Sequence, residues 1–169
     1  MNGYLLDTNA ASALWDARHQ DHEKIRSFLQ ELSASLVWIS VITLAEVEYG
    51  LKIVSRFQES RQQDVRDQMA GFVYVLDIDK HTIHPCSDLR AALFRVYAPR
   101  NRKGRLTKKW VEDLCERTSG KELGIQENDI WLAAQAIQYN LFFVSDDRML
   151  RLIEVSKSFD DPLQIVKWR

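Results

Sequence analysis

The chain has 169 residues, 46 % of them hydrophobic and 28 % charged, which suits one globular domain with a sizeable core. Its formal net charge of -1 excludes a global basic field, so any nucleic-acid contact must come from a local patch. Two cysteines without CxxC spacing argue against a disulfide framework, and the sequence shows neither a signal-peptide pattern nor an apolar run of membrane-spanning length. We therefore expect a cytoplasmic protein.

Strands and helices are predicted to alternate through the N-terminal half. A short strand over 3–6 is followed by Asp7-Thr-Asn9, which favours a helix start, and by an alanine-rich helix through Trp15. Helical spacing of apolar residues predicts further helices over 21–34 and 40–54, and a polar helix follows over about 57–70. Apolar runs predict strands over 37–39 and 72–76.

The same alternation continues to the end of the chain. Helices are predicted over 80–97, where Pro99 ends the pattern, over 107–118 and over 128–139. Strands are predicted over 141–144 and 163–166. Because the strands are continuous apolar runs, we expect an α/β fold with a central parallel sheet of about five strands and helices on both faces.

Four acidic residues stand in separated stretches near the predicted strand ends. Asp7 and Asp147 are expected at the carboxyl ends of strands, whereas Glu46 and Asp129 are expected in the first turns of neighbouring helices. The carboxyl ends of parallel strands share one edge, so the four carboxylates are expected to meet in one cleft. Such a cluster repels itself unless hard cations neutralise it, which predicts a divalent-metal site and phosphate chemistry.

Each acid also has a purely structural alternative. Asp7 is well suited to cap the following helix, Glu46 can be a solvated helix residue, and Asp129 is favoured by the helix dipole. Asp146 and Asp147 compete for one position. The motif spacing selects Asp147 and leaves Asp146 as a turn or cap residue.

Taken together, the four stretches resemble the PIN-domain family, especially the VapC-type ribonuclease toxins of bacterial toxin–antitoxin pairs. The stretches are Leu5-Leu-Asp-Thr-Asn9, Thr43-Leu-Ala-Glu-Val-Glu-Tyr-Gly50, Glu127-Asn-Asp-Ile-Trp-Leu-Ala-Ala134 and Phe143-Val-Ser-Asp-Asp-Arg148. The order and approximate spacing match over most of the chain. Each motif alone is weak, but all four in order are fairly specific.

The resemblance implies a magnesium- or manganese-dependent endoribonuclease with RNA as its substrate. It assigns metal ligation and catalysis to four residues, Asp7, Glu46, Asp129 and Asp147, and supporting hydroxyls to Thr8 and Ser145. It also suggests a homodimer and an antitoxin partner that fills the acidic cleft with a basic side chain. The chain is longer than a compact toxin of this type, so we expect one domain over 1–169 with a basic helical insertion at about 99–124.

The insertion carries a run of cations that ends in an aromatic residue. The run consists of Arg100, Arg102, Lys103, Arg105, Lys108 and Lys109, and Trp110 follows it. Cations can neutralise an RNA backbone, and an aromatic ring can stack on an unpaired base. Two alternatives stand beside RNA binding: a solvated loop that leads into a helix with Trp110 in the core, and a docking site for an acidic partner chain.

The residue types favour hydrolysis by a metal-activated water. Magnesium held by two or three carboxylates keeps positions for a phosphate oxygen and for the attacking water. Glu46, the longest of the four side chains, is our candidate to accept the proton of that water. The alternatives are a receiver-type phosphoacceptor domain, for which the single Asp7 after the first strand is a poor match, and a non-catalytic RNA- or protein-binding module.

Overall fold

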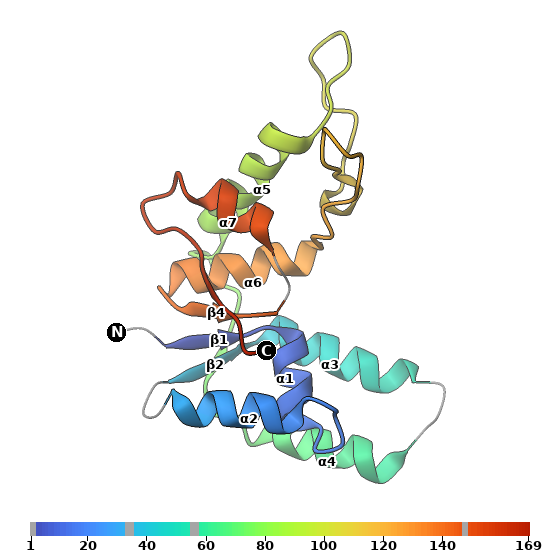
Figure 1. The fold of residues 1–169 in the computed structure, drawn as a ribbon, viewed down its shortest axis with the longest axis vertical. Coiled ribbons are helices and arrows are strands. Elements are labelled where there is room, and N and C mark those ends of the chain that lie inside the picture. The colour runs from blue at the N-terminus through green and yellow to red at the C-terminus, as the bar shows by residue number, and fades with distance from the viewer. Residues whose placement is uncertain (1–2, 33–35, 55–57, 147–148) are drawn as a thin grey trace. The chain divides into compact units, whose positions relative to one another are not determined.

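The computed structural model describes residues 3–32, 36–54, 58–146 and 149–169. Over these ranges the chain forms five strands, seven α-helices and one short 3₁₀ helix. The strands make one sheet in the order β3-β2-β1-β4-β5. Figure 1 shows its neighbouring strands β4, β1 and β2. Their bounds are β1 Tyr4–Leu6, β2 Val37–Ser40, β3 Val75–Leu76, β4 Phe142–Val144 and β5 Gln164–Val166.

The sheet has the parallel character that the apolar runs predict. β1 pairs in parallel with both β2 and β4, and β2 pairs in parallel with β3. From β1 the chain therefore builds the sheet outward through β2 and β3, and it returns to the other side of β1 to add β4. Open parallel sheets bind ligands at such a switch in strand order, outside the carboxyl ends of the strands.

Close packing at the start of β1 depends on Gly3. A Cβ on this residue would lie 2.8 Å from the Leu36 carbonyl oxygen and 2.9 Å from Trp38 Nε1. Leu5 and Leu6 are fully buried, as is Phe143 on β4. The central strands thus carry the apolar core, and only their ends are available for polar chemistry.

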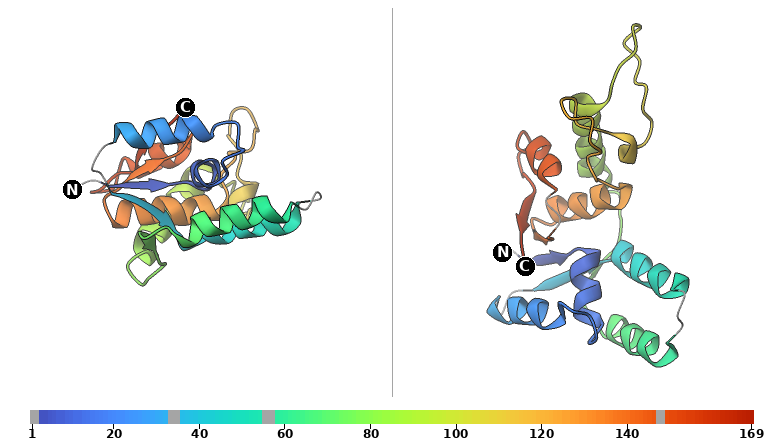
Figure 2. Two further views of the ribbon diagram at one scale, coloured as in Figure 1. Left: turned by 90° about the horizontal axis from the view of Figure 1, so that it is seen from below. Right: turned by 45° about the vertical axis from the view of Figure 1, so that its right-hand side comes forward.

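The domain packs as two compact units. Unit 1 comprises 1–78, 140–147 and 165–169, and unit 2 comprises 79–139 and 148–164. Unit 1 contains α1 (Thr8–Trp15), α2 (His22–Glu31), α3 (Val41–Ile53) and α4 (Glu59–Ala70). Helix α1 contacts the other three helices and lies centrally among them in both views (Figures 1 and 2). Its three buried alanines, Ala10, Ala11 and Ala13, allow this close approach.

In unit 2, α5 (Ile83–Tyr97) packs against α6 (Glu127–Gln138), α7 (Leu150–Ser156) and the 3₁₀ helix η1 (Val111–Asp113). Helix α7 was not predicted from the sequence. None of the helices described here is long and apolar enough to span a membrane.

The predicted helix over 107–118 is wrong, and the 99–124 segment is not helical apart from η1. Its backbone groups pair across two loops instead, through the antiparallel bridges Arg100↔Leu106 and Cys115↔Glu122. Gly104 and Gly120 adopt φ angles of 74° and 66°, which favour turns over helix. The apolar residues Val111 and Leu114 of this segment are buried although the segment is not helical beyond η1.

Candidate functional site

Asp7 lies at the carboxyl end of β1, next to β4 at the switch in strand order. Its side chain is 3 % exposed, and Oδ1 accepts a hydrogen bond of 2.6 Å from Ala10 N in the first turn of α1. Its own backbone N–H donates to the Val144 carbonyl at 3.0 Å. The capping role is therefore real, and it fixes the carboxylate at the edge where a ligand is expected.

Glu46 is brought to the same region by α3. This helix begins after Ser40, the last residue of β2. The Ser40 hydroxyl caps the helix by accepting a hydrogen bond of 3.0 Å from Ile42 N. Glu46 is the sixth residue of α3, so it stands in the second turn and not, as predicted, in the first. The Thr8 hydroxyl, next to Asp7, donates a hydrogen bond to Glu46 Oε2. The first two acidic motifs thus meet through Thr8.

Ser145 follows β4 and is fully buried, and its backbone N–H donates to the Val166 carbonyl at 3.1 Å. The next residue, Asp146, accepts hydrogen bonds from the backbone N–H groups of Trp168 and Arg169 at 3.3 and 3.0 Å. It also pairs with the Arg169 guanidinium. Asp146 therefore fastens the segment after β5, which is neither a turn nor a cap role. Asp147 lies outside the described residues.

Arg169 joins two carboxylates that are distant in sequence. Besides Asp146 it pairs with the buried Asp21 at 2.9 Å. Hydrogen bonding to Asp146 raises the pKa of Arg169, and the hydrogen bond from Lys24 is the main cause of the lowered pKa of Asp21. This contact could not be predicted from the sequence, because 148 positions separate its partners and no local pattern connects them.

Asp129 belongs to unit 2, where it is the third residue of α6, in the first turn as predicted. Its Oδ2 accepts a hydrogen bond of 2.7 Å from Gln126 N, so this carboxylate caps the helix. The neighbouring Glu127 pairs with Arg90. Structural contacts thus occupy Glu127 and one oxygen of Asp129.

Within the described parts of the chain, no three His, Cys, Asp or Glu side chains form a group that could hold a metal ion. Asp7 and Glu46 are described together in unit 1, whereas Asp129 is described in unit 2.

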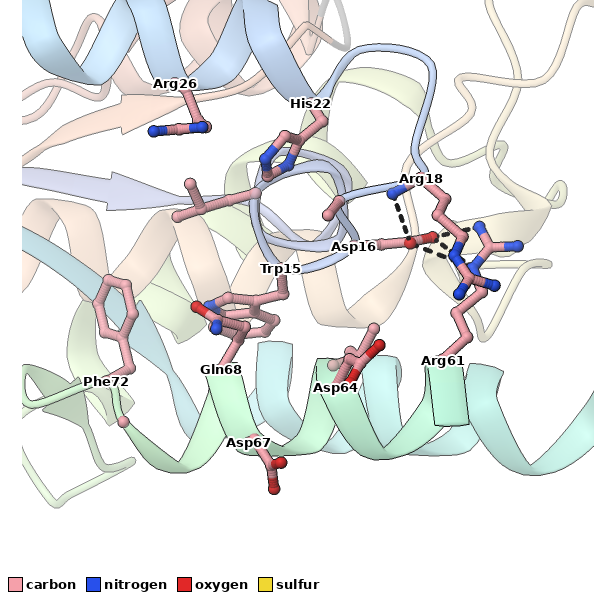
Figure 3. Close-up of a pocket in the computed structure, with 14 residues that line it drawn as sticks. Trp15, Asp16, Arg18, His22, Arg26, Arg61, Asp64, Asp67, Gln68 and Phe72 are labelled. Carbon is pink, nitrogen blue, oxygen red and sulfur yellow. Dashed lines mark hydrogen bonds and ion pairs between the residues drawn. The ribbon is translucent and has the colours of Figure 1, made fainter. Parts of the chain in front are cut away.

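Unit 1 also has an open cleft of about 770 Å³ between α1, α2 and α4, shown in Figure 3. Trp15 and Phe72 contribute apolar surface to it, and the rings pack edge to face with centroids 5.9 Å apart. Arg61 on α4 pairs with Asp16 at the end of α1. Burial tends to raise the pKa of Asp16, but hydrogen bonds from Arg61 and from Arg18 N lower it overall. None of the predicted site residues lines this cleft.

The cations of the 100–109 run lie on an exposed loop of unit 2. Trp110 is 59 % exposed, so the alternative that placed it in the core is wrong.

The sequence profile of the PIN domain matches residues 4–155. The chain belongs to the PIN-domain family. This membership argues against the receiver-type alternative. No curated protein has a significant sequence match to the chain.

Solved structures with the same fold come from VapBC complexes. VapBC2 from Rickettsia felis, bound to a promoter DNA fragment, is 21% identical with a TM-score of 0.65, and the match covers 98% of each chain. DNA-bound VapBC from Salmonella typhimurium is 20% identical with a TM-score of 0.63 over 100% of both chains. VapBC-1 from nontypeable Haemophilus influenzae is 20% identical with a TM-score of 0.62, covering 98% of this chain and 97% of that one. At these identities the likeness shows the shared fold.

Proposed function

We propose that the chain is a divalent-metal-dependent endoribonuclease and the toxin of a toxin–antitoxin pair. The observation that carries the proposal is the meeting of the first two acidic motifs at the switch in strand order, where Thr8 beside Asp7 holds Glu46. Ligands of parallel sheets bind at this place. Membership of the PIN family and the likeness in fold to VapBC complexes support the same interpretation.

Magnesium and manganese suit the side chains of this site. Carboxylate oxygens are the hard ligands that these ions prefer. Asp7 is oriented by the hydrogen bond that it accepts from the Ala10 N–H, and Glu46 by the one that it accepts from the Thr8 hydroxyl. We propose Asp129 and Asp147 as the remaining ligands. A bound ion would lower the pKa of an attacking water and offset charge that develops on the phosphate.

Glu46 is our candidate for the group that accepts the proton of the water. Its carboxylate is half-buried and is oriented by the Thr8 hydroxyl. A carboxylate held in this way can take up a proton without losing its position. Ser145 is the second proposed supporting hydroxyl, and its complete burial after β4 is consistent with a fixed side chain at the same sheet edge.

We further propose that an antitoxin segment seats in the cleft between α1, α2 and α4. The cleft has an apolar surface from Trp15 and Phe72 and a charged rim at Arg61. This segment would continue toward Asp7 and Glu46, where a basic side chain could neutralise the carboxylates.

The proposal is tested by cleavage of a mixed RNA pool with and without Mg²⁺ or Mn²⁺. We expect cleavage that EDTA abolishes and that the variants Asp7→Asn and Asp129→Asn lose. The matched control is Asp88→Asn, because Asp88 is an exposed acid on α5. If both site variants remain folded and cleave at the parent rate, the proposed site is wrong. If the parent neither cleaves RNA nor binds metal in calorimetry, the nuclease function itself is contradicted.

A further inference from the structure

An ordered basic loop projects from unit 2. The loop, residues 100–109, follows α5 and extends away from the helices of the unit in two views (Figures 1 and 2). Asn101 organises it, because its Oδ1 accepts hydrogen bonds from Lys103 N at 2.9 Å and Arg105 N at 3.1 Å. Gly104 N donates to the Asn101 carbonyl at 2.9 Å, and Thr107 N donates to the Pro99 carbonyl at 3.0 Å. The cations thus stand on a fixed backbone.

Packing of the following segment holds the loop in place. Val111 and Leu114 are 2 % and 0 % exposed. Glu116 pairs with Arg151 of α7, and hydrogen bonding to Arg151 lowers the pKa of Glu116. The base of the loop is therefore anchored to the body of unit 2, and its tip is left in solvent.

The cations of the loop differ in their ion pairing from several arginines elsewhere on the chain. Arg61, Arg66 and Arg151 each pair with a carboxylate. Among the described residues, no carboxylate lies within 4.0 Å of any cation of the basic loop. Six like charges over ten residues repel one another, and this repulsion is relieved when phosphate groups approach. The charge of the loop therefore favours binding of a polyanion that is not part of this chain.

An aromatic surface and a pocket lie at the end of the basic loop. Trp110 is 59 % exposed, with Lys109 Nζ 4.9 Å from the centre of its ring. Lys109 also lines a cavity of about 510 Å³ together with Arg90, Phe94 and Trp131. A base can stack on an exposed aromatic ring while cations bind the adjoining phosphates. This combination favours an unpaired strand over a duplex, whose bases are already stacked.

We propose that unit 2 binds a single strand of RNA, with its phosphates along the basic loop and an unpaired base at Trp110 and the adjoining pocket. This inference rests on the proposed ribonuclease function and identifies the residues that would hold its substrate. An acidic protein could also be attracted by the charges. RNA is favoured because the exposed ring and the cation-lined pocket adjoin the charged loop and offer a stacking surface that an acidic chain does not need.

The test is fluorescence anisotropy of a labelled, unstructured RNA strand of about 12 nucleotides in EDTA, over a series of salt concentrations. EDTA removes the metal, so binding is measured independently of cleavage. The test variant carries Arg102→Ser, Lys103→Ser and Arg105→Ser. The matched control carries Lys80→Ser, Arg95→Ser and Lys157→Ser, three exposed cations elsewhere in unit 2. Trp110→Ala tests stacking, and an RNA duplex of the same sequence serves as competitor.

We expect the loop variant to bind at least about tenfold more weakly near 0.1 M salt. The plot of log affinity against log salt should also become less steep, its negative slope decreasing in magnitude by about 2. Trp110→Ala should weaken binding about tenfold with little change in that slope. The control should bind like the parent, and the duplex should compete poorly.

Binding by the loop variant equal to that of the control overturns the proposal. If the loop variant binds RNA like the control but no longer retains an acidic protein that co-purifies with the parent, the loop is a protein-docking site and the proposal is likewise overturned. Normal strand binding without any metal-dependent cleavage supports the binding surface while it contradicts the nuclease function.

Discussion

At the residue scale, Asp7 combines a helix cap with a proposed metal ligand, and two substitutions separate these roles. Asparagine caps a helix about as well as aspartate, so Asp7→Asn should abolish cleavage with a melting temperature close to that of the parent. Asp7→Ala removes the acceptor of the Ala10 N–H and should also reduce the free energy of unfolding by about 1 kcal/mol. Thermal melting and RNA cleavage measure the two effects. An Asp7→Asn variant that retains cleavage would remove Asp7 from the site.

The adjacent acids Asp146 and Asp147 provide a second comparison. Asp146 holds Trp168 and Arg169 through three contacts, so Asp146→Asn should lower the melting temperature and leave substantial cleavage. Asp147→Asn should lose cleavage, because we propose Asp147 as a metal ligand. Both variants are compared by thermal melting and by cleavage rate per folded protein. The reverse pattern would show that the motif spacing selected the wrong acid.

The four acids are predictable from local sequence motifs, and the local environments of those that the structure describes agree in part with the prediction. The helix-start pattern at Asp7 and the first-turn position of Asp129 are both present in the structure. Thr8 could be named because it stands beside Asp7, but its hydrogen bond to Glu46 joins residues 38 positions apart. Contacts of that range depend on strand order and not on any local pattern. The same reason explains why the Asp21–Arg169 pair was missed.

At the element scale, long periodic segments were predicted well and short or irregular ones were not. The helix predicted over 40–54 is observed as Val41–Ile53, and the helix over 128–139 as Glu127–Gln138. The predicted strand over 72–76 is reduced to Val75–Leu76. The helix predicted over 107–118 is wrong because apolar residues at helical spacing, such as Val111 and Leu114, also occur in buried loops. Here turns at glycines with positive φ determine the backbone.

Two glycines test how tightly the elements pack. A Cβ on Gly3 would approach backbone and ring atoms of β2 and the residue before it, so Gly3→Ala should destabilise the protein by about 1–3 kcal/mol. Gly50 lies inside α3, and beyond the adjacent backbone of that helix no atom lies within 4 Å of an added Cβ, so Gly50→Ala should stabilise the protein by about 0.5–1 kcal/mol. Urea denaturation measures both changes. Equal effects of the two substitutions would contradict the close packing at the start of β1.

At the scale of the whole molecule, paired carboxylates predict a loss of stability in acid. Burial acts to raise the pKa of Asp16, but hydrogen bonds from Arg61 and from Arg18 N lower it overall. A hydrogen bond from Lys24 lowers the pKa of Asp21, and one from Arg66 lowers the pKa of Glu48. Each folded-state pKa lies below its unfolded value, so the unfolded chain binds more protons in acid. The stability contributed by these groups is present above about pH 4 and is lost as the pH falls through the folded-state values.

We therefore expect the melting temperature to be nearly constant around neutral pH and to fall below about pH 4. Scanning calorimetry across this range measures the change, and Glu48→Gln should give a shallower fall because one such carboxylate is absent. A melting temperature that is unchanged down to about pH 3 would contradict these ion pairs.

We propose that carboxylates at the switch in strand order support metal-dependent RNA hydrolysis. The most direct test is the rate of RNA cleavage against Mg²⁺ concentration for the parent, Glu46→Gln and Glu48→Gln. Both residues lie on α3, but Glu46 accepts from Thr8 whereas Glu48 pairs with Arg66 and Lys52 at 3.0 and 3.4 Å. We predict that Glu46→Gln slows cleavage about a hundredfold or more and that Glu48→Gln cleaves like the parent. Cleavage by Glu46→Gln at the parent rate at every Mg²⁺ concentration would show that RNA hydrolysis does not depend on this carboxylate.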